Sequence, residues 1–181
     1  MKTAFLGASL AAIVGSVAAA DVTYSFTNQT WTGFNFTEAY TAGGLSGTLT
    51  GATVNATLNA STNYTYANDL TVYVAGSPLA LGGALQCGGF SPLNAAQRYS
   101  WANGASSAPG ATVTGTVNFT TGIDMSASPT LSVWIGNGYG SAGTSGTFTG
   151  SITLLGVTAV PAPGAIALVG LAGLVGRRRR S

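Results

Sequence analysis

The sequence contains no histidine and only one cysteine, and only 6% of its 181 residues carry a charge. Without histidine, neither serine–histidine nor cysteine–histidine catalysis can be built, and most zinc sites lose a usual ligand. Cys87 cannot form a disulfide within the chain, and no histidine or lysine lies near it in sequence to activate its thiol. We therefore expect Cys87 to be a small apolar residue and the protein not to be an enzyme.

Positive charge is also scarce in the body of the chain. The formal net charge of +2 arises at the ends, from Lys2 and from the run Arg177, Arg178, Arg179 and Arg180. Between residues 21 and 160 the charged residues are Asp21, Glu38, Asp69, Arg98 and Asp124, four acids and one base, so the body has a net charge of 1 − 4 = −3. Nucleic-acid binding requires clustered lysine and arginine, so nucleic acid is excluded as a partner.

The few carboxylates leave two chemical alternatives. A glycoside hydrolase needs two acids about 5 to 9 Å apart, which Glu38, Asp69 and Asp124 could in principle supply, Glu38 with Asp69 or Asp124 being the candidate pairing. Calcium needs six or more oxygen ligands, to which Asp69 or Asp124 could contribute. Because no motif brings these acids together, we expect Asp69 and Asp124 to cap turns and predict no cofactor or metal.

Residues 1–20 have the parts of a secretory signal peptide. Lys2 precedes an apolar stretch, and the small residues Ala18 and Ala20 come directly before Asp21. Signal peptidases require such small residues, so we expect a signal helix that is recognised by the export machinery and cleaved before Asp21. The alternative is a buried N-terminal helix.

The C-terminal end is equally distinct in composition. Val160, Pro161, Ala162, Pro163 and Gly164 interrupt the preceding structure, a run of apolar residues extends to Gly176, and four arginines follow. As a helix, residues 163–176 would be about 21 Å long at 1.5 Å per residue. Such a helix satisfies its own backbone in lipid, and the arginines fix its orientation.

This tail resembles the PEP-CTERM sorting signal of Gram-negative bacteria. In that family a Pro-Glu-Pro motif, a transmembrane helix and an arginine cluster are recognised by exosortase, a membrane-embedded protease. The chain differs from the family in having Ala162 at the glutamate position. The resemblance implies an exported protein held at the cell envelope and an exosortase-like partner. The alternative is an ordinary anchor helix that remains in the membrane.

The body, residues 21–158, alternates between apolar and polar residues at period two. This alternation is typical of antiparallel sheets with one buried and one wet face. The candidate strands are Val22–Thr27, Thr30–Thr37, Leu45–Thr50, Val54–Leu58, Leu70–Val74, Arg98–Trp101, Val113–Phe119, Leu131–Ile135 and Phe148–Leu154. They predict an all-β antiparallel β-sandwich of jelly-roll type, followed by a sorting and anchor segment at residues 159–181. Residues 66–78 are similar to the strand entry of jelly-roll P domains, which implies that topology and no active site.

Turn-forming residues and aromatics supply the remaining expectations. We expect residues 102–110 and 136–143 to be exposed loops. Tyr73 and Trp134 alternate with valine and isoleucine and are predicted on the wetter face, whereas Trp101 and Tyr139 lie in or beside loops. Trp101, Trp134 and Tyr139 could therefore form a platform on which sugar rings stack, the alternative being core or cross-strand packing.

These features predict where the protein is located more clearly than what it does. We expect an exported protein of the cell surface of a Gram-negative-type bacterium, with a structural, adhesive or extracellular-matrix role and exopolysaccharide as a candidate partner. The alternative function is a carbohydrate-binding module that uses exposed tryptophan and tyrosine.

Overall fold

The computed structural model describes residues 21–77, 79–83, 97–127, 130–140 and 143–161. Within these ranges the chain forms strands and a single 3₁₀ turn, η1 (Ala67–Asp69). The strands are β1 (Val22–Thr32), β2 (Phe36–Tyr40), β3 (Leu45–Thr62), β4 (Leu70–Ala75), β5 (Leu79–Leu81), β6 (Gln97–Tyr99), β7 (Ala111–Asp124), β8 (Ser132–Asn137) and β9 (Ser145–Ala159). The all-β prediction is confirmed.

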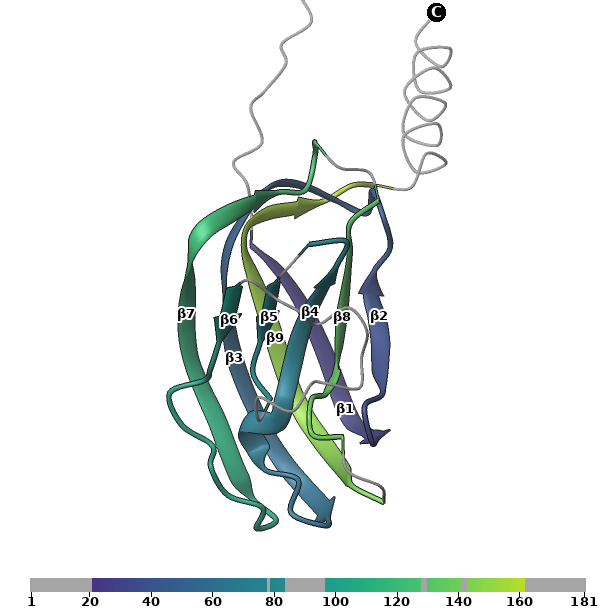
Figure 1. Cartoon of the computed structure of the whole chain (residues 1–181), viewed down its shortest axis with the longest axis vertical. Coiled ribbons are helices and arrows are strands. Elements are labelled where there is room, and N and C mark those ends of the chain that lie inside the picture. Colours follow the sequence, from purple (N-terminus) through teal and green to yellow (C-terminus); the bar gives the residue numbers. More distant parts are fainter. Residues whose placement is uncertain (1–20, 78, 84–96, 128–129, 141–142, 162–181) are drawn as a thin grey trace, which may run out of the picture.

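The strands are arranged in two sheets. The four-stranded sheet has the order β1-β9-β3-β7, and the five-stranded sheet has the order β2-β8-β4-β5-β6. All pairs are antiparallel except the short β5–β6 pair. Strands of both sheets run along the molecule, with β7 at one side and β2 at the other (Figure 1). The chain passes repeatedly from one sheet to the other, so strands far apart in sequence become neighbours.

One hydrophobic core joins the inner faces of the two sheets. Leu58 and Ile152 of the four-stranded sheet and Val72 and Ile135 of the five-stranded sheet belong to the same buried cluster. Aromatic rings extend this cluster, because Trp31 packs edge-on against Phe26 with ring centroids 5.6 Å apart. The alternating residues that predicted half-buried strands thus supply the core, and burial of their apolar surface is the main stabilising term.

Several predicted boundaries change in the folded chain. The two segments predicted over residues 45–50 and 54–58 form the single strand β3, whose pairing shifts at bulges instead of ending. The predicted strand over residues 30–37 divides at Gly33, where φ is +61° and the chain crosses between sheets. The expectation of an exposed loop over residues 136–143 is wrong for Gly136, Asn137 and Gly138, which are buried, because β8 extends to Asn137.

Both ends of the body are hydrogen-bonded to the sandwich. Asp21 accepts a hydrogen bond from Gly156 N–H (3.2 Å), and Val160 donates its N–H to the Gly44 carbonyl (2.9 Å). Val160 and Pro161 are exposed. Ala18 and Ala20, the tail from Ala162 onward with Pro163, Gly164 and the four arginines, and Cys87 all lie outside the described residues. In the part of the chain that the structure describes, no helix is long and apolar enough to cross a membrane.

Candidate functional site

The outer face of the four-stranded sheet is lined by hydroxyl side chains. Along each strand, residues of this face alternate with buried core residues, as Thr53, Asn55 and Thr57 do with Val54 and Ala56. We call this surface the hydroxyl face; from β1, β9, β3 and β7 in turn it comprises Thr23, Ser25, Thr30, Thr32, Ser145, Thr147, Thr149, Ser151, Thr153, Thr53, Asn55, Thr57, Ala60, Thr62, Thr112, Thr114 and Thr116. Every one of these residues is threonine, serine, asparagine or alanine, so the face carries no charge.

The strand register aligns these hydroxyls in rows across the sheet. One row runs from β1 to β7 through Thr23, Thr153, Thr53 and Thr116, each paired with the next. The adjacent row consists of Ser25, Ser151, Asn55 and Thr114. Neighbouring strands lie about 4.8 Å apart, and alternate residues along a strand about 6.8 Å apart. The rows therefore repeat in two directions.

Hydrogen bonds join several pairs of these hydroxyls across neighbouring strands. Thr23 Oγ1 lies 2.8 Å from Thr153 Oγ1, and Thr53 Oγ1 lies 2.7 Å from Thr116 Oγ1. Similar bonds join Thr30 to Thr147 (2.7 Å) and Thr62 to Ser145 (2.6 Å). Each hydroxyl has one proton and two acceptor lone pairs, so a pair that shares one bond still presents a donor and acceptors to the surface. The hydroxyl face thus presents donors and acceptors without charge, which is the chemistry that would suit a neutral, hydroxyl-rich partner.

A bulge interrupts the face at β1. Pairing between β1 and β9 shifts between Phe26 and Gln29, and Asn28 adopts a positive φ of +49°. The Asn28 N–H donates to Thr149 Oγ1 (2.9 Å), and the Asn28 side-chain oxygen accepts from Asn59 Nδ2 (2.7 Å). Asparagine tolerates this left-handed conformation better than most residues. The extra residues are thus tied back into the same polar network.

The aromatic platform predicted from sequence is not formed. Trp101 is only 4% exposed, and its indole N–H donates to the Leu70 carbonyl at 2.7 Å. Trp101 does lie beside β6 in a loop, but of the two alternatives, stacking platform and core packing, its ring takes the second and belongs to the main core. Trp134 is half-buried and donates its ring N–H to Ser132 Oγ (2.8 Å). Tyr139 is also half-buried. Its N–H donates to Asn137 Oδ1 (3.1 Å), and its carbonyl accepts from Asn137 Nδ2 (3.2 Å).

Tyr73 is another correction to the sequence analysis. It was expected on the wet face of its strand, but it is 3% exposed. Its cross-strand partners are Trp134 and Ala80, and with Phe36 they form a second small hydrophobic cluster. The five-stranded sheet therefore has apolar residues on both faces around β4. The alternating sequence of β4 does not show this, because it predicts one apolar and one polar face.

The carboxylates have structural roles. Asp69 is 1% exposed and accepts the Tyr66 N–H at 2.7 Å, closing η1. Asp124 accepts the N–H groups of Ser126 (2.9 Å) and Ala127 (3.1 Å) in the turn after β7. The prediction that both cap turns is confirmed. Glu38 lies on β2 in the five-stranded sheet, Asp69 in η1, and Asp124 at the end of β7 in the four-stranded sheet, so three different elements carry these acids. Among the residues that the structure describes, no three potential ligands from histidine, cysteine, aspartate and glutamate come together.

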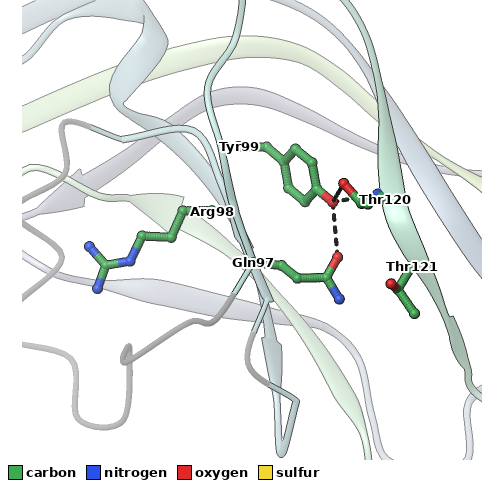
Figure 2. A pocket seen from close by; sticks show the side chains of 5 residues that line it. All are labelled: Gln97, Arg98, Tyr99, Thr120 and Thr121. Atoms are coloured by element: carbon green, nitrogen blue, oxygen red, sulfur yellow. Dashed lines mark hydrogen bonds between the residues drawn. The ribbon is translucent and has the colours of Figure 1, made fainter.

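Two cavities lie beside β6, one toward η1 and one toward β7. A cavity of about 420 Å³ is lined by Asp69 and Trp101 among others, whose polar atoms are already used in the bonds above. A second cavity of about 320 Å³ is lined by Gln97, Arg98, Tyr99, Thr120 and Thr121. In Figure 2 Tyr99 points toward Thr120 while Arg98 points the opposite way. The Tyr99 hydroxyl lies 2.9 Å from Gln97 Oε1 and 3.0 Å from Thr120 Oγ1, and it accepts the Thr120 N–H.

Comparison with known proteins assigns no relative. No protein-family model matches the chain, and neither a curated protein nor a solved structure matches it. The candidate site therefore depends on the geometry alone.

Sequence reasoning identified the threonine-rich wet faces but not the surface that they form. The signal was the alternation of threonine, serine and asparagine with apolar residues in β1, β3, β7 and β9. What the sequence does not contain is the strand order, which places β9 between β1 and β3. Only this order and its register join four separate polar stripes into the hydroxyl face.

Proposed function

We propose that this chain is an exported bacterial envelope protein whose β-sandwich body has a structural, adhesive or matrix-forming role. The hydroxyl face is the observation that carries this proposal. A broad neutral surface of donors and acceptors suits repeated weak contacts with hydroxyl-rich polymers, which need neither a deep pocket nor charge. The extracellular polysaccharide matrix is a partner of that chemistry.

The two termini support the location. The signal-type residues up to Ala20 precede a body that starts at Asp21, and β9 ends at Ala159 immediately before the proline motif of the tail. The folded body thus occupies the interval that the two targeting segments leave free. Export, envelope attachment and processing by an exosortase-like protease form one proposal, in which the hydrophobic tail holds the body at the membrane before cleavage or permanently.

The strand order supports the finer topology that we propose, a jelly roll. Successive strands alternate between the sheets at β1, β2, β3 and β4 and again at β7, β8 and β9. This alternation is the arrangement of two-sheet jelly rolls, with β5 and β6 together occupying one edge.

The carbohydrate-binding alternative loses the aromatic platform on which it was based. Burial of Trp101 and the half-burial of Trp134 and Tyr139 leave no shared surface of those three rings. Contact with polysaccharide is therefore proposed through the hydroxyl face. Such binding is expected to be weak for one chain and to gain strength from many anchored copies.

Substitutions on the hydroxyl face test the proposal. The full chain is expressed in a polysaccharide-producing Gram-negative host that contains an exosortase, and the fraction of the protein retained in the washed matrix is measured. The variant Thr57→Glu/Thr149→Glu places two charges at the centre of the face, and we expect it to reach the surface but to be released by washing. Thr41→Glu, at an exposed position outside the face, is the matched control. Equal retention of all three proteins would contradict the proposal.

A further inference from the structure

The two sheets have four edge strands, and these edges are protected to different degrees. An edge strand presents unpaired N–H and C=O groups and is a template for pairing with another chain. Proteins protect such edges with short strands, charges, bulges or covering groups. In the described part of the chain the edge strands are β1 and β7 of the four-stranded sheet and β2 and β6 of the five-stranded sheet.

Both edges of the five-stranded sheet are protected by length and charge. The strand β6 has only three residues and contains Arg98, the one base of the body. The strand β2 has five residues, contains Glu38 and has a register shift between Glu38 and Tyr40. Neither edge offers a long run of regular backbone to a partner.

The β7 edge is protected by side chains. Asn103 accepts the Thr114 N–H with its Oδ1 (2.9 Å) and donates from its Nδ2 to Thr114 Oγ1 (3.1 Å). Further along the strand, the Tyr99 hydroxyl accepts the Thr120 N–H (Figure 2). Two backbone donors that face away from β3 are thereby occupied, and a strand approaching β7 would meet these side chains first.

The β1 edge has no such protection in the described structure. It is eleven residues long and contains neither a charged residue nor proline. Its only irregularity is the bulge between Phe26 and Gln29, which leaves Val22–Phe26 in regular pairing with β9. Within this stretch Thr23 and Ser25 are exposed, and the inward-facing Val22 and Tyr24 are only half-buried.

We infer that β1 is a self-association edge, and that two copies of this chain pair antiparallel through residues 22–26. A two-fold axis perpendicular to the sheet would join the four-stranded sheets of the two copies into one sheet of eight strands. Both hydroxyl faces would then lie on the same side. The occupant is a second copy because β1 is self-complementary. It has no charge to repel its own image. Outside, the hydroxyls of Thr23 and Ser25 lie opposite each other, and inside, the half-buried Tyr24 lies opposite its own image and Val22 opposite Phe26.

This pairing deepens the proposed structural role, because it doubles the hydroxyl face and links neighbouring anchored copies. The biological meaning of the pairing rests on the proposed function, but the pairing and the proposed function can be contradicted by different results. Loss of pairing in the purified protein would leave surface location unchanged, whereas a protein that pairs but remains in the cytosol would contradict only the proposed function.

Lysine substitutions at the two edges test the pairing. Full-length protein is purified in mild detergent, and its dimer dissociation constant is measured by analytical ultracentrifugation with the detergent density-matched. Thr23→Lys/Ser25→Lys places like charges opposite each other across the two-fold axis. We expect its dissociation constant to rise at least tenfold, about 1.4 kcal/mol. Thr112→Lys/Thr116→Lys is the matched control on β7, since each pair of substitutions removes one threonine–threonine hydroxyl bond.

A second variant keeps the test decisive if lysine disturbs folding. Thr23→Cys/Ser25→Cys in a Cys87→Ser background should form covalent dimers on mild oxidation, and Thr112→Cys/Thr116→Cys should not. A wild-type protein that remains monomeric at high concentration would overturn the inference. The same conclusion follows if dimers persist unchanged in the β1 lysine variant. It also follows if the β1 and β7 cysteines crosslink equally.

Discussion

Thr23 and Thr116 lie at opposite ends of one cross-strand row, 93 residues apart in the sequence (116 − 23) and joined through Thr153 and Thr53. Both terminal hydroxyls are within hydrogen-bond distance of the neighbouring threonine. The two residues are equivalent in position on the hydroxyl face but differ in what lies beyond them. On either side of Thr116, side chains occupy the edge donors Thr114 N–H and Thr120 N–H of β7, whereas the β1 edge at Thr23 has no such covering side chain in the described structure.

The inner face of β3 is predicted to dominate stability. Leu58 is fully buried in the common core, and Leu58→Ala should lower the free energy of unfolding by about 2–5 kcal/mol. The neighbouring Thr57 points to the hydroxyl face, and Thr57→Ala should change the free energy of unfolding by about 0.5 kcal/mol or less. Urea denaturation of both variants provides the measurement. Comparable losses would show that the two faces of β3 are not distinct.

Trp101 is predicted to act in folding and not in ligand binding. Trp101→Phe keeps an aromatic ring but leaves the buried Leu70 carbonyl without its indole donor. An unsatisfied buried acceptor costs about 1–3 kcal/mol, and we expect a loss of unfolding free energy in that range. Binding to a glycan array should be unaffected when measured well below the melting temperature. Selective loss of glycan binding with unchanged stability would instead restore Trp101 as a stacking residue.

Gly156 is predicted to be irreplaceable at its bulge. It has a φ of +80°, and an added Cβ would lie 2.4 Å from the Thr48 carbonyl oxygen. Gly156→Ala must therefore adopt a strained conformation and displace the β3 backbone, and we expect a loss of about 1–3 kcal/mol. The midpoint of thermal unfolding measures the effect. A variant as stable as the wild type would mean that β3 and β9 do not approach this closely.

Alkaline pH is predicted to destabilise the protein through the half-buried Tyr40 and the buried Tyr73. Burial raises the pKa of Tyr40 above its ordinary value of about 10, and the neighbouring Tyr24 raises it further. Burial also raises the pKa of Tyr73. The folded state thus binds these protons more tightly than the unfolded state. The stability due to protonated tyrosine is complete below about pH 10 and is lost as the pH rises through the folded-state pKa values.

Tyr40→Phe removes one of these titrating groups. We expect the variant to lose less unfolding free energy than the wild type between about pH 9 and about pH 12, as measured by urea denaturation at each pH. Tyr64→Phe is the control, because the Tyr64 side chain is 74% exposed and its surroundings change little on unfolding. A steeper alkaline loss in Tyr40→Phe would contradict the predicted sign.

The sequence predicts the all-β body well because its strands alternate locally. Segments such as Val113–Phe119 and Phe148–Leu154 fall entirely within β7 and β9. Local alternation fails where burial depends on neighbouring strands. Tyr73 alternates with valine as a surface residue would, yet Trp134 and Ala80 on either side cover it. The three-residue β5 has too few residues to produce a periodic signal and was missed.

The candidate site depends on information that one sequence does not contain. Turn capping by Asp124 was predictable, because aspartate bonds to backbone N–H groups within its own turn. The hydroxyl face was not, since it requires the register of four strands that are scattered along the chain. The same is true of Trp101, whose burial results from a long-range contact with the start of β4.

The location of the mature protein tests the account most directly. Cells expressing the full chain are fractionated, the protein is recovered from each fraction, and its N-terminal sequence is determined together with its susceptibility to protease added outside intact cells. We predict a chain that begins at Asp21, is found in the envelope and is accessible from outside. An intact chain that begins at Met1 and is recovered from the cytosol would contradict the account.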